Sequence, residues 1–453
     1  MWGGGSNLKR KLPFLIVAII CFVLFAFSGV GWATTIDYYV DGSKADDTAN
    51  GLSWANAKKT IYGCIEQVVT DLDGVVGNQA TINVSGGTSG RTYQETHNLI
   101  FSKGAHYPAV GGGALTLHDG SLGKPWTLQG STEGGHNGQV SIDASTITTW
   151  QTYGAVIVTN MNYFHLRRIQ INPGSGDQTK DDVYYSVAEY GLIEHCRLPE
   201  YGAHGISMSA SEESVIRYNY VKGRNHNDNS SGIKIAHTTT DNTEVYYNVI
   251  DSSGSTGANY HAGINIYNAS GVKVYNNTIY NTSDIGILLW GTAGVGADDV
   301  VLYNNVISED TEYSIVIDEN CGSLTSDYNL IYKTGNVGYV GGTFTAVGGP
   351  AGGATKTFAE WQAAGYDANS TNALPLFVSA TDFSLKLTSP AIDAGVLIAG
   401  LHVAGWTDMA GTDRLYGTGV DIGAYEVVQY KASLPLFLPW FSIPAIYPWY
   451  VAP

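Results

Sequence analysis

The six residues Val274-Tyr-Asn-Asn-Thr-Ile279 decide the fold, because related hexapeptides recur along the chain. Close copies lie at residues 245–250 and 302–307, and each has asparagine at its fourth position. The last apolar residues of the series, at positions 171, 198, 221, 250, 279, 307 and 331, are separated by 27, 23, 29, 29, 28 and 24 residues. A repeat of this length indicates a solenoid or a propeller.

A second short apolar segment accompanies each copy. The segments begin at Gly205, Gly232, Gly263, Gly286 and Ser314, and each alternates apolar and other residues, as in Gly232-Ile-Lys-Ile. Alternation with a period of two predicts short strands, two or three to a repeat. Propeller blades of about 40 residues are longer than these repeats. The sequence therefore predicts an all-β fold, a coiled parallel β-solenoid.

The recurrent asparagines have a structural role in such a coil. Equivalent turn positions on successive coils stack about 4.8 Å apart. An inward asparagine can then bond the turns above and below and satisfy buried backbone groups. Cys196 occupies this position in one early coil, which predicts a buried thiol.

Composition changes along the chain divide it into segments. Residues 60–72 have apolar positions at helical spacing, which predicts a capping helix at the open end of the solenoid. Glycine-rich residues 333–353 break the repeat, and a short helix is expected near residues 358–364. We predict a signal peptide (1–33), an N-terminal cap (34–75), β-helix coils (76–332), an irregular insertion with a C-terminal closing segment (333–428) and an apolar tail (429–453).

The two ends of the chain differ in composition from the repeats. Lys9-Arg10-Lys11 precedes an uncharged apolar run and Gly31-Trp32-Ala33, the pattern of a secretory signal peptide. We therefore expect a secreted, extracellular or cell-surface protein. The 22 residues after Lys431 carry no charge and contain five prolines among aromatic residues. Because proline interrupts helices, we expect an extended arm, with residues 434–453 contacting the protein surface, a partner protein or the cell envelope.

Charge restricts the partners. The net charge is −17, and removal of the three basic residues near the start leaves 20 basic against 40 acidic side chains, or −20. This field repels phosphate backbones, so nucleic acid is excluded as an expected partner. It also disfavours polyanionic sugars unless a basic patch or a divalent cation intervenes.

Segments outside the repeats resemble a known family. Tyr38-Tyr39-Val40-Asp41-Gly42, Gly51-Leu-Ser53-Trp54-Ala55, Ser389-Pro-Ala-Ile-Asp-Ala-Gly395 and Val420-Asp-Ile-Gly-Ala-Tyr-Glu426 are similar to the two ends of secreted right-handed parallel β-helix proteins of the pectin-lyase-like superfamily. The resemblance covers about residues 36–428 and implies a right-handed parallel β-helix. That fold carries lyases, hydrolases, epimerases and non-catalytic surface proteins, so the resemblance implies no single activity. The Asp-Pro-His-Glu signature of alginate epimerases is absent.

Candidate functional residues gather on three consecutive coils. Aligned repeats place Ser207, Lys234, Asn265, Leu288 and Val316 in one outward column, and Tyr267 and Trp290 in the next. Long loops before these strands carry further polar residues. As candidate catalytic residues we take Lys234, Arg224, His204 and His261, and as candidate substrate-binding residues Tyr267, Trp290, His226, Asp228, Tyr260 and His237.

One hypothesis is β-elimination at a uronic acid polymer. A lysine with a pKa lowered by desolvation can abstract the C5 proton, and Lys234 is the candidate base. Arg224 would neutralise the carboxylate, and His204 or His261 would protonate the leaving oxygen. Tyr267 and Trp290 would stack on sugar rings.

The alternatives remain open at this point. Outward lysines, loop histidines and aromatic pairs also cover solvated surfaces, so the protein is either a polysaccharide-acting enzyme or a non-catalytic surface, adhesion or structural β-helix protein. A glycoside hydrolase is a further alternative, although the aligned outward positions offer no carboxylate pair at the required spacing.

Calcium is a candidate cofactor. Asp41, Asp46 and Asp47, or Asp177, Asp181 and Asp182, could supply oxygen ligands. The sequence has no EF-hand spacing, and acidic turns are common.

Overall fold

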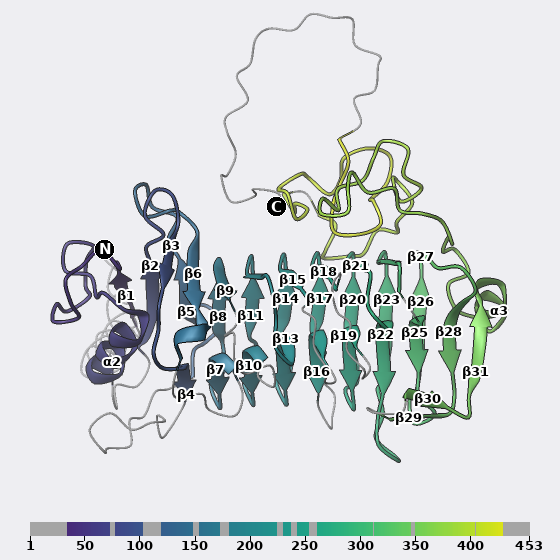
Figure 1. Ribbon diagram of the computed structural model, residues 1–453, viewed down its shortest axis with the longest axis horizontal. Helices are drawn as coiled ribbons and strands as arrows, with labels where there is room; N and C mark the ends of the chain where they lie inside the picture. Colours follow the sequence, from purple (N-terminus) through teal and green to yellow (C-terminus); the bar gives the residue numbers. More distant parts are fainter. Residues whose placement is uncertain are drawn as a thin grey trace, which may run out of the picture.

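The computed structural model describes residues 34–72, 78–102, 119–147, 154–172, 181–223, 230–236, 242–252, 261–310, 312–345, 349–403 and 405–428. The expected signal peptide (1–33) and the expected tail (429–453) lie outside these residues. The described chain forms a long stack of coils with three β-sheets along its length, in which all strand pairs are parallel except β28 (Asn336–Val340) with β31 (Ala354–Thr357) (Figure 1). Within the described residues no helix is long and apolar enough to cross a membrane.

The first two sheets run almost the whole length of the stack. The first sheet consists, in spatial order, of β1 (Thr35–Val40), β2 (Gln79–Val84), β5 (Trp126–Gly130), β8 (Phe164–Arg167), β11 (Leu192–Glu194), β14 (Val215–Arg217), β17 (Glu244–Tyr246), β20 (Lys273–Tyr275), β23 (Val300–Tyr303) and β26 (Leu324–Asp327). The second sheet consists of β4 (Leu99–Ser102), β7 (Gly154–Thr159), β10 (Asp181–Ser186), β13 (His204–Ser209), β16 (Ser231–Ala236), β19 (Ala262–Tyr267), β22 (Ile285–Trp290), β25 (Tyr313–Ile317), β28 (Asn336–Val340) and β31 (Ala354–Thr357).

The third sheet completes each coil. It consists of β3 (Arg91–Tyr93), β6 (Val140–Asp143), β9 (Ile169–Asn172), β12 (Arg197–Leu198), β15 (Tyr220–Lys222), β18 (Val249–Asp251), β21 (Thr278–Tyr280), β24 (Val306–Ser308) and β27 (Leu330–Tyr332). Each coil takes one strand from the second, the first and then the third sheet, as in β13, β14 and β15. The predicted right-handed parallel β-helix is confirmed.

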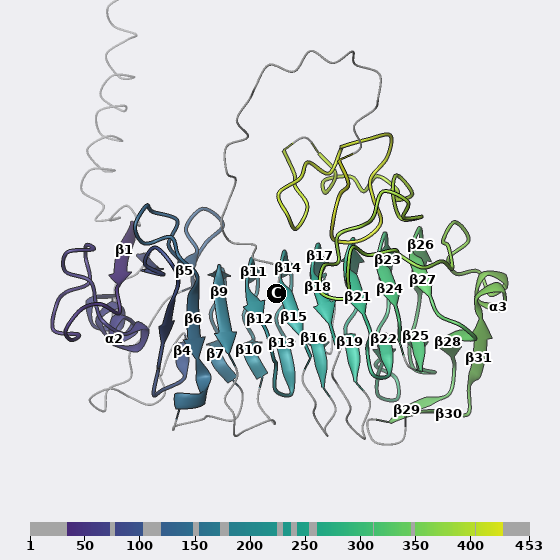
Figure 2. The same ribbon diagram turned by 45° about the horizontal axis from the view of Figure 1, so that its top comes forward.

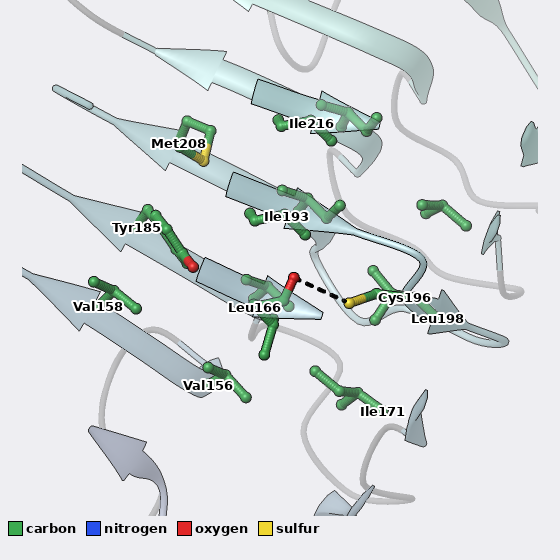
Figure 3. Packing of buried hydrophobic residues seen from close by; sticks show 14 of the residues in the cluster. Val156, Val158, Leu166, Ile171, Tyr185, Ile193, Cys196, Leu198, Met208 and Ile216 are labelled. Carbon is green, nitrogen blue, oxygen red and sulfur yellow. Dashed lines mark hydrogen bonds between the residues drawn. The ribbon is translucent and has the colours of Figure 1, made fainter. Parts of the chain in front are cut away.

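The core fills the interior of the coils with stacked apolar side chains. Val156, Leu166, Ile193 and Ile216 are buried on neighbouring coils, and parallel pairing keeps Leu166, Ile193 and Ile216 in one column (Figure 3). Cys196 is 2% exposed, and its Sγ lies 3.8 Å from the carbonyl oxygen of Leu166. The sequence-based expectation of a buried thiol at this position therefore agrees with the structure.

The recurrent asparagines form the expected ladder. Asn219, Asn248, Asn277 and Asn305 each donate from Nδ2 to Oδ1 of the next asparagine at 3.0–3.1 Å, and the series ends at Asn329. Each also donates to a carbonyl oxygen of the preceding coil, as Asn277 does to Val245 at 2.9 Å. The side chains thus satisfy backbone groups that have no contact with water.

Both ends of the solenoid are capped. At the start, the helix α2 (Ile61–Leu72) packs Ile61, Cys64, Ile65 and Val68 on the core. At the far end, α3 (Phe358–Ala363) buries Trp361, whose indole N–H donates to Asp367 at 2.7 Å. Asp367 also accepts from Nδ2 of Asn329 at 2.8 Å, so this carboxylate terminates the asparagine ladder.

The irregular C-terminal part, residues 372–428, lies along one side of the coils rather than beyond their end (Figures 1 and 2, yellow). Its Leu401 joins a buried cluster with Tyr218 and Tyr247 of the coil turns. Arg414 is fully buried and donates to the carbonyl oxygens of Asp421 and Gly423 at 2.7 and 3.2 Å. This closing segment therefore covers the corner between the first and third sheets.

Candidate functional site

Lys234 lies in β16, on the outward face of the second sheet. Pairing aligns it with Ser207 of β13 on one side and with Asn265 of β19 on the other. Further along the same row come Leu288 and Val316. This register is the one expected from the repeats, because alternate residues of a strand face opposite sides of the sheet and the apolar ones face the core.

The amine of Lys234 reaches the neighbouring strand. Its Nζ lies 3.3 Å from Nε2 of His204, which begins β13. Both side chains are partly buried. Burial lowers the pKa of Lys234, because desolvation penalises the ammonium, and the charge of Asp181 acts in the opposite direction. The geometry therefore joins two of the candidate catalytic residues, an amine and an imidazole.

His261 has a different environment. Its side chain is 1% exposed, and its Nδ1 bonds with Oγ of Ser230. Its backbone N–H donates to Oδ2 of Asp284 at 2.8 Å. Of the two candidate acids, His204 is the one that contacts Lys234 in the described part of the chain.

The aromatic pair expected to bind sugar rings, Tyr267 and Trp290, lies at the end of β19 and β22. Tyr267 and Trp290 contact each other, with ring centroids 4.4 Å apart and planes inclined by 38°. Trp290 Nε1 donates to Oδ1 of Asn265 at 2.8 Å, and Phe344 meets the indole edge-on with centroids 5.2 Å apart. Phe344 belongs to a hairpin of β29 (Thr343–Thr345) and β30 (Gly349–Ala351). Trp290 thus packs against a buried apolar cluster, and both Tyr267 and Trp290 are partly buried.

Five candidate residues lie outside the described part of the chain. They are Arg224, His226, Asp228, His237 and Tyr260. They remain sequence-based predictions.

The first set of aspartates considered for calcium has protein partners, and Asp177 of the second set lies outside the described residues. Asp41 accepts from Arg91 and Ser43, and Asp46 accepts from the backbone and hydroxyl of Thr48. Asp47 accepts from the backbone N–H groups of residues 59 and 60 at the start of α2. Over the described ranges, no group of three or more His, Cys, Asp or Glu side chains is arranged to hold a metal ion.

A polar row on the first sheet was not predicted. Arg167, Glu194 and Arg217 are adjacent in register, and Glu194 pairs with both arginines at 3.0 and 2.7 Å. Arg217 continues the row by donating to the hydroxyl of Tyr246 at 3.0 Å and lies over Trp406 of the closing segment. The alternation of Arg, Glu and Arg at one position of successive repeats is the signal that could have revealed this row.

Comparison with known proteins bears on the fold. Residues 255–347 match the family described as right-handed beta helix region. The chain is a right-handed parallel β-helix protein. No curated protein matches its sequence.

Several solved structures resemble this β-helix protein. Pectate lyase Pel9A has 13% identity and a TM-score of 0.41, with 88% of this chain and 98% of that chain covered. An alginate lyase from a Paenibacillus species has 14% identity and a TM-score of 0.41, with 69% and 91% covered. The lacto-N-biosidase from Eubacterium ramulus has 12% identity and a TM-score of 0.40, with 67% and 65% covered. The fold assignment rests on the strand pairing and on the family match.

Proposed function

We propose that this β-helix protein acts on an extracellular polysaccharide that contains uronic acid, and that it cleaves the chain by β-elimination at the Lys234–His204 pair. The observation that carries the proposal is the 3.3 Å contact between Nζ of Lys234 and Nε2 of His204 on the outward face of the second sheet. Burial that lowers the pKa of Lys234 favours the neutral amine that a base requires.

The two groups divide the proton transfers between them. The neutral amine of Lys234 takes the C5 proton of the uronate, and the electron pair of that bond forms a double bond between C4 and C5. The bond from C4 to the bridging oxygen breaks, and protonated His204 gives its Nε2 proton to that oxygen. The products are a chain with a new hydroxyl end and a chain with an unsaturated end, so protons and electrons balance.

The active protonation state also suits the charge of the substrate. Base and acid act together only when the amine is neutral and the imidazole is protonated, so the pair carries one positive charge. That charge lies beside Asn265, an amide on the next strand in register with Lys234. Its attraction for a uronate carboxylate offsets part of the repulsion from a chain with a net charge of −17. Arg224 and a calcium ion are proposed as further sources of positive charge.

The proposal also includes export of the protein. The expected signal peptide would deliver the protein to the compartment that contains the polysaccharide. A non-catalytic adhesion or structural role and glycoside hydrolysis are the competing functions. Neither needs an amine of lowered pKa in contact with an imidazole.

The test is a panel of soluble uronate polysaccharides, incubated with the protein with and without calcium. Ultraviolet absorbance of the unsaturated product should appear with at least one polymer. Release of reducing ends without this absorbance would identify a hydrolase instead. Absence of both signals across uronate and neutral polymers would contradict the enzymatic proposal and favour the adhesion role.

A further inference from the structure

Two stacked tyrosines project from the corner between the second and first sheets, away from the Lys234 site. Tyr163 precedes β8, and Tyr190 occupies the equivalent position one coil later, two residues before β11. Their rings are stacked, with centroids 4.6 Å apart and planes inclined by 10°. Tyr190 is 41% exposed. The structure therefore presents a flat aromatic surface at this corner.

The backbone at this corner does not favour tyrosine. Tyr163 and Tyr190 have φ angles of +56° and +57°, in the left-handed region that asparagine and glycine adopt most readily. The equivalent positions of the next three coils contain Glu213, Asn242 and Gly271, with φ angles of +53°, +54° and +78°. Val187, three residues before Tyr190, is also left-handed and is 48% exposed. Tyr218 and Tyr247 have the same left-handed backbone but are buried, so the exposure of Tyr190 is what distinguishes the Tyr163–Tyr190 pair.

A second tyrosine stack in the same protein shows how such a surface is occupied. His195, Tyr218 and Tyr247 form a stack at the opposite corner, with centroid distances of 4.9 and 5.2 Å. The closing segment covers that stack with Leu401, and the hydroxyl of Tyr218 donates to the carbonyl oxygen of Thr407 at 2.9 Å. The Tyr163–Tyr190 stack has no equivalent burial, because Tyr190 remains exposed.

The charges around Tyr190 define what can bind there. The carboxylates that act electrostatically on its hydroxyl are Glu189, Glu212 and Glu213. Oε2 of Glu189 accepts from Asn162 at 3.2 Å, and Oε1 of Glu213 accepts from Asn242 at 2.9 Å. Carboxylate oxygens accept hydrogen bonds from hydroxyl groups but repel anionic polymers.

We propose that the corner formed by Tyr163, Tyr190, Glu189 and Glu213 is a second carbohydrate-binding site, which takes a neutral polysaccharide. The C–H face of a sugar ring would pack on the exposed face of Tyr190, where the ring carries partial negative charge. The sugar hydroxyls would donate to the glutamates. Successive coils repeat at about 4.8 Å, so the tyrosine ring and the glutamate oxygens lie one after another along the path of an extended polysaccharide. The site is distinct from the Lys234–His204 pair in place, in charge and in ligand class.

Affinity gel electrophoresis tests this site with three neutral polymers in the gel: galactomannan, xylan and mixed-linkage β-glucan. We expect at least one of these polymers to retard the protein. A gel that contains polygalacturonate is the comparison with an anionic polymer. Tyr190→Asn should weaken retardation about tenfold while leaving the melting temperature unchanged or higher, because asparagine suits the left-handed backbone. Tyr190→Phe should retain binding. Leu415→Ala, at an exposed apolar residue of the closing segment, is the matched control and should bind as the wild type does.

Three results would overturn the proposal. The first is that none of the neutral polymers retards the protein. The second is retardation that Tyr190→Asn does not weaken. The third is that the tyrosines bind something else, seen either as binding of a lysine-rich peptide that Tyr190→Asn abolishes or as a dimer that this variant dissociates. Because the assay measures binding and not cleavage, its result is independent of any lyase activity.

Discussion

Nζ of Lys234 and Nε2 of His204 lie 3.3 Å apart, although 30 residues separate them in sequence. The contact exists because β16 pairs with β13 in parallel register, which brings consecutive coils to the distance of neighbouring strands. An amine of lowered pKa and an adjacent imidazole can act as the base and the acid of one reaction. The proposed mechanism depends on this relationship.

The pH dependence of cleavage should report both groups. We expect a bell-shaped rate profile, because the pair acts only when it holds a single proton on His204. His204→Gln removes the acid and should give a slower reaction whose rate rises with pH without an alkaline decline. The midpoint of this rise should lie below the ordinary lysine value of about 10.4, because burial lowers the pKa of Lys234. An unchanged bell-shaped profile in His204→Gln would show that His204 is not the acid.

The asparagine ladder should accept one more member at Cys196. The backbone N–H of Cys196 already donates to Oδ1 of Asn219 at 2.9 Å, and its Sγ faces the carbonyl oxygen of Leu166. In Cys196→Asn the new amide can donate to that oxygen, so we expect the free energy of unfolding to rise by about 1 kcal/mol. Cys196→Val supplies no donor and is the control. Urea denaturation measures both, and a Cys196→Asn protein less stable than Cys196→Val would contradict the prediction.

Asp310 should make stability depend on pH. It is 4% exposed, accepts from Oγ1 of Thr282 at 2.7 Å, and burial raises its pKa to about 7. The folded state keeps this proton from about pH 4, where the unfolded chain loses it, up to about pH 7, so stability falls with rising pH in this window by at most about 4 kcal/mol. Asp310→Asn should therefore gain melting temperature relative to the wild type between pH 5 and pH 8.

The control for this comparison is Asp413→Asn, at an exposed aspartate of the closing segment. The difference in melting temperature between Asp413→Asn and the wild type should be similar at pH 5 and at pH 8. If the melting temperature of Asp310→Asn also differed from that of the wild type by the same amount at pH 5 and at pH 8, Asp310 would not hold its proton in the folded state.

Much of the fold could be predicted because the repeats set both register and burial. The spacing of Asn219, Asn248 and Asn277 requires turns that stack, and the ladder of side-chain bonds follows from that. The capping helix was predictable from its apolar spacing, since α2 buries one face. The position of the closing segment was not, because Leu401 and Trp406 pack on aromatic side chains more than a hundred residues away.

The candidate site was predictable only in part. Alignment of the repeats could place Lys234 beside Ser207 and Asn265, because strand pairing preserves columns. It could not show that the lysine side chain bends toward His204, nor that Phe344 covers Trp290, because rotamers and hairpin packing are not periodic. The exposed Tyr163–Tyr190 stack was also missed, since left-handed turns lie outside the strand pattern.

The role of Lys234 as the base is tested by the initial rate of unsaturated product formation by the wild type, Lys234→Ala and Lys273→Ala. Lys273 is the matched control, an outward lysine on the first sheet that pairs with Glu244 at 2.9 Å. We expect a loss of about 10²-fold or more in Lys234→Ala, with Lys273→Ala at the wild-type rate. A Lys234→Ala protein that retains the wild-type rate would contradict this role.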